Sequence, residues 1–193
     1  MSKKERDRVA EKAARLIVDG VENEYLDAKD RAIMMLGLDA TNHRPTNRKI
    51  REYISLLTKE ELGADEVRRR LKEMRLIALD LMQILDDFDP FLIGSVLSGQ
   101  IRTTSDIDLH AFADYYCQVM TTLEDAGYDE AEEELIENQK GRFIHLKWRE
   151  KNYPVEITVY PWSWREIVPI SSVTGQPMKR ADIIEVRKLT ARS

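Results

Sequence analysis

The spacing of apolar residues in this chain changes at Pro90. From Glu5 to about Asp87, apolar residues recur every three or four positions, which is typical of amphipathic helices. After Pro90, short apolar runs alternate with turn residues, as expected for strands. We therefore expect an α/β (α+β) fold. An all-helical N-terminal extension over residues 1–88 packs on a domain over residues 89–193, in which helices flank a small mixed sheet and the chain ends in a helix.

The helical part divides into four segments. Gly20 and Gly37 end the first two, because glycine is common just after a helix C-terminus. The third has Thr46 or Asn47 as its N-cap, and the fourth is longer and ends before Pro90. All four carry apolar residues on one face, so they need a core to pack against.

The second part of the chain has runs of strand length. We expect strands at FLIGSVL (91–97), DIDLHAF (106–112), GRFIHLKW (141–148) and YPVEITVYPW (153–162), a helix at YYCQVMTTLEDAGY (115–128) and a last short helix from about Ala181. These runs predict a mixed sheet with helical cover.

Length and composition limit the class of protein. With 193 residues, of which 42% are apolar, the chain suits one ordinary domain or a small catalytic domain with helical additions. No apolar run approaches the ~20 residues that span a bilayer, and the charged N-terminus lacks the apolar segment of a secretory signal. The single cysteine, Cys117, makes neither a disulfide nor a zinc site within the chain. We expect a cytoplasmic protein with no membrane partner.

The net charge of −5 makes long nucleic acid an unfavoured partner, because phosphate backbones are held mainly by Lys and Arg. A local basic segment, VRRRLKEMR (67–75), is the exception. On a helix its five cations, which include Arg75, spread around the exposed sides. We interpret this segment as a solvated face, with a patch for an anionic ligand as the alternative.

Two aspartates stand in an otherwise apolar strand. Asp106 and Asp108 are two positions apart, so their side chains share one face of the strand and repel each other. A carboxylate in such a half-buried place loses hydration worth several kcal/mol unless a partner replaces the water. A divalent cation removes both problems, and Mg²⁺ prefers such hard oxygen ligands. The alternative is a capped turn with both acids facing solvent.

A glycine-serine pair precedes the two aspartates. Gly94 lets the backbone approach a phosphate, and the Ser95 hydroxyl can bind its oxygens. Arg102 lies in the loop between the pair and the aspartates, as a phosphate contact or a solvent-exposed cation. A phosphate binder beside a metal binder is the arrangement that phosphoryl or nucleotidyl transfer requires.

A third acid lies on the last expected strand. In this strand Val155, Ile157 and Val159 share one face, and Glu156 lies on the other. We interpret Glu156 as a third metal ligand, against the alternative of an exposed glutamate in a cross-strand pair.

Seven residues fill the fixed positions of a spaced pattern, GSxxxGxxxxxSDxDL: Gly94, Ser95, Gly99, Ser105, Asp106, Asp108 and Leu109. This pattern resembles the signature of the DNA polymerase beta-like nucleotidyltransferase superfamily, and most closely that of the minimal nucleotidyltransferases of bacteria and archaea. The whole chain is also similar to a little-studied group of bacterial proteins with a helical first half. The resemblance implies a nucleotidyltransferase fold, with metal on the paired acids and on a third acid from a later strand.

The resemblance also implies an activity. We expect a nucleotidyltransferase that moves an NMP from Mg-NTP to an acceptor hydroxyl and releases pyrophosphate. Asp106, Asp108 and Glu156 are the catalytic residues and the ligands of Mg²⁺, in a site with room for two ions where Mn²⁺ can substitute. The expected nucleotide-binding residues are Gly94, Ser95, Gly99, Arg102 and Ser105. ATP is favoured only as a general expectation, because no residue of the sequence indicates a base preference. The acceptor is a protein, an RNA end or a small molecule.

Two other classes of function stay open. The same fold serves a non-catalytic nucleotide-binding regulator, or an antitoxin-like protein that modifies or masks a partner. The helical extension offers a surface for a homodimer. Trp162 and Trp164 either stack on a base or belong to the core or a lid, and His110 lies on the face of the acids as a ligand contact or a partly buried histidine.

Overall fold

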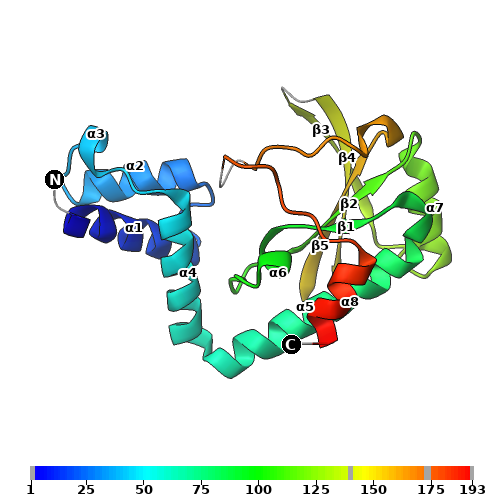
Figure 1. Cartoon of the computed structure of the whole chain (residues 1–193), viewed down its shortest axis with the longest axis horizontal. Helices are drawn as coiled ribbons and strands as arrows, with labels where there is room; N and C mark the ends of the chain where they lie inside the picture. Colours follow the sequence, from blue (N-terminus) through cyan, green and yellow to red (C-terminus); the bar gives the residue numbers. More distant parts are fainter. Residues whose placement is uncertain (1–2, 139–140, 172–174, 192–193) are drawn as a thin grey trace. The chain divides into compact units, whose positions relative to one another are not determined.

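The computed structural model of the chain describes residues 3–138, 141–171 and 175–191. It contains two compact units (Figure 1). The first comprises Met1–Val67 and Ile170–Gln176, and the second comprises Arg68–Pro169 and Pro177–Ser193. The second unit carries all the residues of the predicted site.

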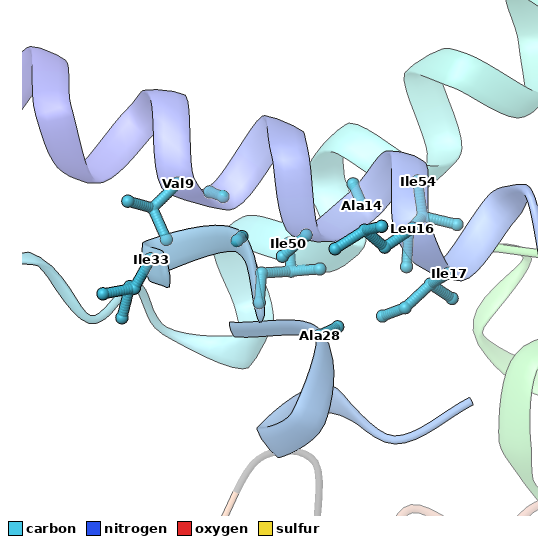
Figure 2. Close-up of a cluster of buried hydrophobic side chains, with 11 residues drawn as sticks. Val9, Ala14, Leu16, Ile17, Ala28, Ile33, Ile50 and Ile54 are labelled. Atoms are coloured by element: carbon cyan, nitrogen blue, oxygen red, sulfur yellow. The ribbon is translucent and has the colours of Figure 1, made fainter. Parts of the chain in front are cut away.

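The first unit is a small helical bundle. It holds α1 (Lys3–Val18), α2 (Tyr25–Met35), α3 (Ala40–His43) and α4 (Asn47–Leu62). Figure 2 shows its core, in which apolar side chains of α1, α2 and α4 meet. Many of the buried positions are alanines, such as Ala10, Ala14 and Ala28, and small side chains let helices approach closely.

The predicted ends of these helices are confirmed. The Thr46 hydroxyl accepts a hydrogen bond from the backbone N–H of Lys49 at 3.2 Å, so Thr46 is the N-cap of α4. Gly20 and Gly37 follow α1 and α2 with φ of +70° and +63°, a conformation that glycine adopts without strain. None of the helices in the described part of the chain has the length and apolar character that crossing a membrane requires.

The second unit is built on the predicted mixed sheet, which has five strands. The strands are β1 (Phe91–Leu92), β2 (Ile107–Phe112), β3 (Glu132–Asn138), β4 (Gly141–Glu150) and β5 (Tyr153–Tyr160). They lie in the order β1-β2-β5-β4-β3, where only the β2–β5 pair is parallel and the other pairs are antiparallel. The chain thus brings two strands that are far apart in sequence side by side at the centre of the sheet.

The remaining elements of this unit are helical. They are α5 (Ala64–Ile84), α6 (Gly94–Ser98), α7 (Tyr116–Asp125), α8 (Ile183–Ala191) and the short 3₁₀ helices η1 (Asp86–Phe88) and η2 (Trp162–Trp164). Of α5, the residues from Arg68 onward belong to the second unit. Figure 1 shows α5, α7 and α8 around the sheet, and their buried residues include Met82, Leu123 and Val186. One face of β2 and β5, with Leu109 and Ile157, is fully buried and contributes to this core.

Two predictions of local structure were wrong. The run FLIGSVL is a strand only at Phe91–Leu92, because Gly94 has φ +71° and the chain then turns into α6. Strand β3 was not predicted, since its sequence EEELIEN is acidic and lacks the apolar content of a strand. At the edge of a sheet, charged side chains instead protect the unpaired backbone.

Arg75 of α5 is buried and not part of a solvated face, contrary to the interpretation of the basic segment. Only 8% of its surface is exposed. Its guanidinium donates hydrogen bonds to the carbonyls of Val96 at 3.1 Å and Leu97 at 3.3 Å. These carbonyls lie in the last turn of α6, where a helix leaves its C=O groups without internal partners. Arg75 therefore attaches α6 to α5.

We predict that Arg75→Met destabilises the second unit by about 1–3 kcal/mol, because two carbonyls lose a charged donor. The test is urea unfolding followed by tryptophan fluorescence, since Trp148, Trp162 and Trp164 all lie in this unit. Arg187→Met, at an exposed position of α8, is the matched control and should change the stability by less than about 0.5 kcal/mol. Equal effects of the two substitutions would contradict the role assigned to Arg75.

Candidate active site

The structure places the predicted acids next to one another. Asp108 of β2 and Glu156 of β5 are direct partners in the parallel pair, so their side chains stand on the same face of adjacent strands. Asp106 lies two residues before Asp108, immediately before β2 begins at Ile107. The register of one strand pair thus joins carboxylates that are almost fifty residues apart in sequence.

Burial and the neighbouring acids perturb the pKa of the Asp108 carboxyl group. Burial raises its pKa from 3.8 to about 7, with further contributions from the negative charges of Asp106 and Glu156. Arg102 acts in the opposite direction and favours the ionised form. At neutral pH the protein therefore holds a carboxyl group that any added positive charge would ionise.

Gly94 is where the backbone comes closest to Asp108. A Cβ atom built on Gly94 would lie 2.2 Å from Oδ2 of Asp108, far inside the contact distance. The backbone N–H of Ile93 also donates to the Asp108 carbonyl at 3.0 Å. A glycine at this position is therefore required both by its φ of +71° and by the space that Asp108 occupies.

The other motif residues fix the loop between α6 and β2. The Ser95 hydroxyl donates to Oγ of Ser105 at 3.0 Å, and this Oγ accepts the backbone N–H of Arg102 at 2.8 Å. Ser105 is buried, so this small network is shielded from water. Gly99 ends α6 in the left-handed conformation at φ +74°. These contacts attach both Ser95 and the Arg102 backbone to Ser105.

Glu156 has two partners that the sequence analysis missed. Nδ1 of His145 lies 3.0 Å from its Oε1, and Nζ of Lys147 lies 3.3 Å from its Oε2. His145 and Lys147 hold the pKa of Glu156 below its usual range, although burial acts in the other direction. Alternation along β4, antiparallel to β5, would have placed both residues on the face of the acids had the strand pairing been known.

The donor set suits a hard divalent cation, but the side chains do not yet surround one. Within residues 3–138, 141–171 and 175–191, no group of three or more His, Cys, Asp or Glu side chains is placed to hold a metal ion. Three carboxylates that repel one another around Asp108 are nevertheless the chemistry that Mg²⁺ or Mn²⁺ relieves. The residues present therefore fit the cation in kind, with Glu156 turned toward His145 and Lys147.

The same face of the sheet becomes aromatic beyond the acids. His110 is buried, and its ring meets that of Tyr160 edge to face at 4.8 Å between centroids. Burial, with smaller effects of Arg180 and His145, lowers the pKa of His110 to about 4, so it is neutral at physiological pH. Trp164 stacks on Tyr160 at 5.9 Å and belongs to this cluster.

Trp162 lies apart from the acids. It is 45% exposed and follows the carboxyl end of β5, whereas Glu156 is in the middle of that strand. It lines an open hollow of about 520 Å³. The other lining residues are mostly charged: Asp86, Asp87, Asp89, Ser163, Arg165 and Glu166. The structure thus separates the two tryptophans that the sequence analysis treated together.

Comparisons with known proteins give only partial likenesses. No protein-family model and no curated protein matches the chain. A structure of Cid1 in complex with the UTP analogue UMPNPP is 23% identical over 47% of this chain and 30% of that chain, with a TM-score of 0.34. A cytoplasmic RNA terminal U-transferase is 20% identical over 58% of this chain and 34% of that chain, with a TM-score of 0.35. A Cid1 poly(U) polymerase structure bound to MgATP is 19% identical over 47% of this chain and 32% of that chain, with a TM-score of 0.35.

This chain thus spans about a third of the length of those proteins. Because the TM-scores are below 0.5, the likenesses do not assign a function, and the proposal below rests on the residues of this chain. The narrower resemblance to a bacterial group stays a prediction.

We predict that Asp108→Asn stabilises the metal-free protein at neutral pH. The folded state binds the Asp108 proton up to about pH 7 but the unfolded chain loses it near pH 3.8, so this group lowers stability as the pH rises between these values. In EDTA at pH 8, the variant should be about 1–3 kcal/mol more stable than the wild type. At pH 4 the two should differ little.

Urea unfolding at both pH values measures this difference. A difference between variant and wild type that is the same at pH 4 and pH 8 would show that Asp108 is not held in the neutral form.

We predict that Gly94→Ala destabilises the second unit by about 2–4 kcal/mol, because of the clash with Asp108 and the left-handed backbone. In an Asp108→Ala background the clash is gone, since only the Asp108 Cβ at 3.5 Å remains. The same substitution should then cost about 1 kcal/mol, the penalty of the backbone alone. A double-mutant cycle in urea gives both values, and full additivity would refute the contact.

Proposed function

We propose that this chain is a nucleotidyltransferase that moves an NMP group from an NTP to an acceptor hydroxyl. One observation carries the proposal: the β2–β5 register, which makes Asp108 and Glu156 neighbours, with Asp106 beside them. Gly94 supports it, because it brings backbone close to the same carboxylate. Three acids clustered at two adjacent strands have little structural use, but they are a platform for a metal and a phosphate chain.

Asp106, Asp108 and Glu156 are the proposed ligands of Mg²⁺, for which Mn²⁺ can substitute. When bound, such a cation neutralises charge on the triphosphate and on the developing transition state. The raised pKa of Asp108 supports this assignment, because burial and the negative charges of Asp106 and Glu156 disfavour its ionised form, which a bound cation would favour. Glu156 reaches the cation by giving up one of its contacts with His145 and Lys147.

The triphosphate is proposed to lie over α6 and the following loop. The Ser95 hydroxyl and the backbone at Gly94 bind the β- and γ-phosphates, and Arg102 adds a charge on the other side. Ser105 and Gly99 hold the loop in place through the Ser105 network and the end of α6. To donate to a phosphate oxygen, the Ser95 hydroxyl gives up its hydrogen bond to Oγ of Ser105.

In the proposed reaction the acceptor oxygen forms a bond to the α-phosphorus, and the bond from this phosphorus to the β-phosphate oxygen breaks. Pyrophosphate leaves with the bonding electrons. Glu156 polarises the acceptor hydroxyl, whose proton passes to water. The net charge of −5 favours a protein side chain or a small molecule over long nucleic acid as the acceptor.

A non-catalytic nucleotide-binding regulator is the second candidate. It is favoured by the contacts of Glu156, whose two carboxylate oxygens face His145 and Lys147. In that case the site binds a nucleotide without turnover.

We predict Mg²⁺-dependent NTP binding that is lost in Asp106→Asn/Asp108→Asn. Isothermal titration calorimetry with each of the four NTPs, with and without Mg²⁺, measures it. The matched control is Asp86→Asn/Asp87→Asn, which removes the same charge from an exposed pair in η1 and should bind as the wild type does. A folded wild type that binds none of the NTPs at millimolar concentration would contradict the proposal.

Release of pyrophosphate in the presence of an acceptor separates the two candidates. Binding that survives in the Asp106→Asn/Asp108→Asn variant would place the nucleotide elsewhere on the chain.

A further inference from the structure

Lys147 lies between two carboxylates on the face that carries the acids. On β4 it stands directly opposite Glu156 of β5. Its Nζ donates a hydrogen bond to Oε2 of Glu134 on β3 and lies 3.3 Å from Oε2 of Glu156. Lys147 and Glu134 are about half exposed, whereas Glu156 is more buried. The flexible Lys147 cation is therefore shared by two carboxylates: the outer, more exposed one of Glu134 and the inner, more buried one of Glu156.

The contact with Lys147 occupies one of the two carboxylate oxygens of Glu156. Oε1 of Glu156 faces Nδ1 of His145 at 3.0 Å, so Oε2 is the oxygen that Lys147 neutralises. The hydrogen bond to Glu134 is the main reason that the pKa of Lys147 lies above its usual range, so this side chain is a permanent cation. A divalent ion beside Glu156 would repel it.

We propose that Lys147 is an exchangeable counter-ion of Glu156: it neutralises Glu156 in the metal-free protein and moves onto Glu134 alone when a divalent cation binds. This inference rests on the proposed function, because it takes Glu156 as a metal ligand. The four-carbon stem and compact charge of lysine suit such a movement, since they require no fixed geometry. When the ammonium group of Lys147 leaves Glu156, it keeps its hydrogen bond to Glu134.

The proposal makes two predictions of opposite sign. Lys147→Gln removes the competitor and should tighten Mn²⁺ binding about two- to fivefold, while it lowers the melting temperature of the metal-free protein. Glu134→Gln removes the outer partner, leaves Lys147 on Glu156 and should weaken Mn²⁺ binding by a similar factor of about two to five. A purely structural role of Lys147 would weaken binding and stability together.

Electron paramagnetic resonance of free Mn²⁺ measures these affinities on the full chain, with and without a non-hydrolysable NTP. Arg142→Gln and Glu137→Gln are the matched controls, because these residues form an exposed ion pair on the same two strands. Arg142→Gln changes the net charge as Lys147→Gln does, and Glu137→Gln changes it as Glu134→Gln does. Both controls should leave the Mn²⁺ affinity within about twofold of the wild-type value. Circular dichroism confirms that each variant is folded.

The outcomes separate the two proposals. If the wild type binds Mn²⁺ and Asp108→Asn does not, but Lys147→Gln and Glu134→Gln fail to move the affinity in opposite directions, the counter-ion role is overturned and the proposed function stands. The counter-ion role is also overturned if the controls move as much as the test variants. If the wild type binds no Mn²⁺ even with the nucleotide, both proposals fail.

Discussion

The close approach of the Gly94 backbone to the Asp108 carboxylate is the contact on which the candidate site depends. It sets the start of α6, because the chain leaves β1 through a left-handed glycine and cannot continue as a strand. It also leaves no room for a side chain at position 94 beside Oδ2 of Asp108, whose pKa is raised by burial. The turn out of β1 and the start of α6 therefore depend on one residue without a side chain.

The sheet face around this contact is organised by charge. Acids and their cations occupy the row through Asp108, Glu156 and Lys147. Further along the same strands, the side chains become aromatic around Tyr160, and a neutral His110 lies at the boundary. Lys147 and Glu156 in the polar part of the face are partly exposed, whereas His110 in the aromatic part is buried. Such a division is what a site for a charged substrate beside a stable core requires.

The sequence predicts the fold class and the members of the acid cluster for different reasons. Apolar periodicity is a local signal, so the long helices and the central strands β2, β4 and β5 could be predicted from it. The spaced motif indicated Gly94, Asp106 and Asp108 without any knowledge of strand order. Their proximity to Glu156 could not be derived, because it depends on a parallel pairing between distant strands.

Other features could not be predicted because they depend on contacts between elements. Arg75 looks like any cation of an exposed helix face until α6 is placed against it. His145 and Lys147 acquire their roles only through the register of β4 on β5. Strand β3 lacks an apolar signal of its own, and pairing with β4 determines its conformation.

The most direct test of the central claim is a crystal structure of the chain with Mn²⁺ and a non-hydrolysable NTP, in which anomalous scattering locates the metal. We expect a metal peak in contact with the carboxylates of Asp106 and Asp108, with the phosphates of the nucleotide next to Gly94 and Ser95. Metal or nucleotide bound away from these carboxylates would contradict the assignment of this face of the sheet as the active site.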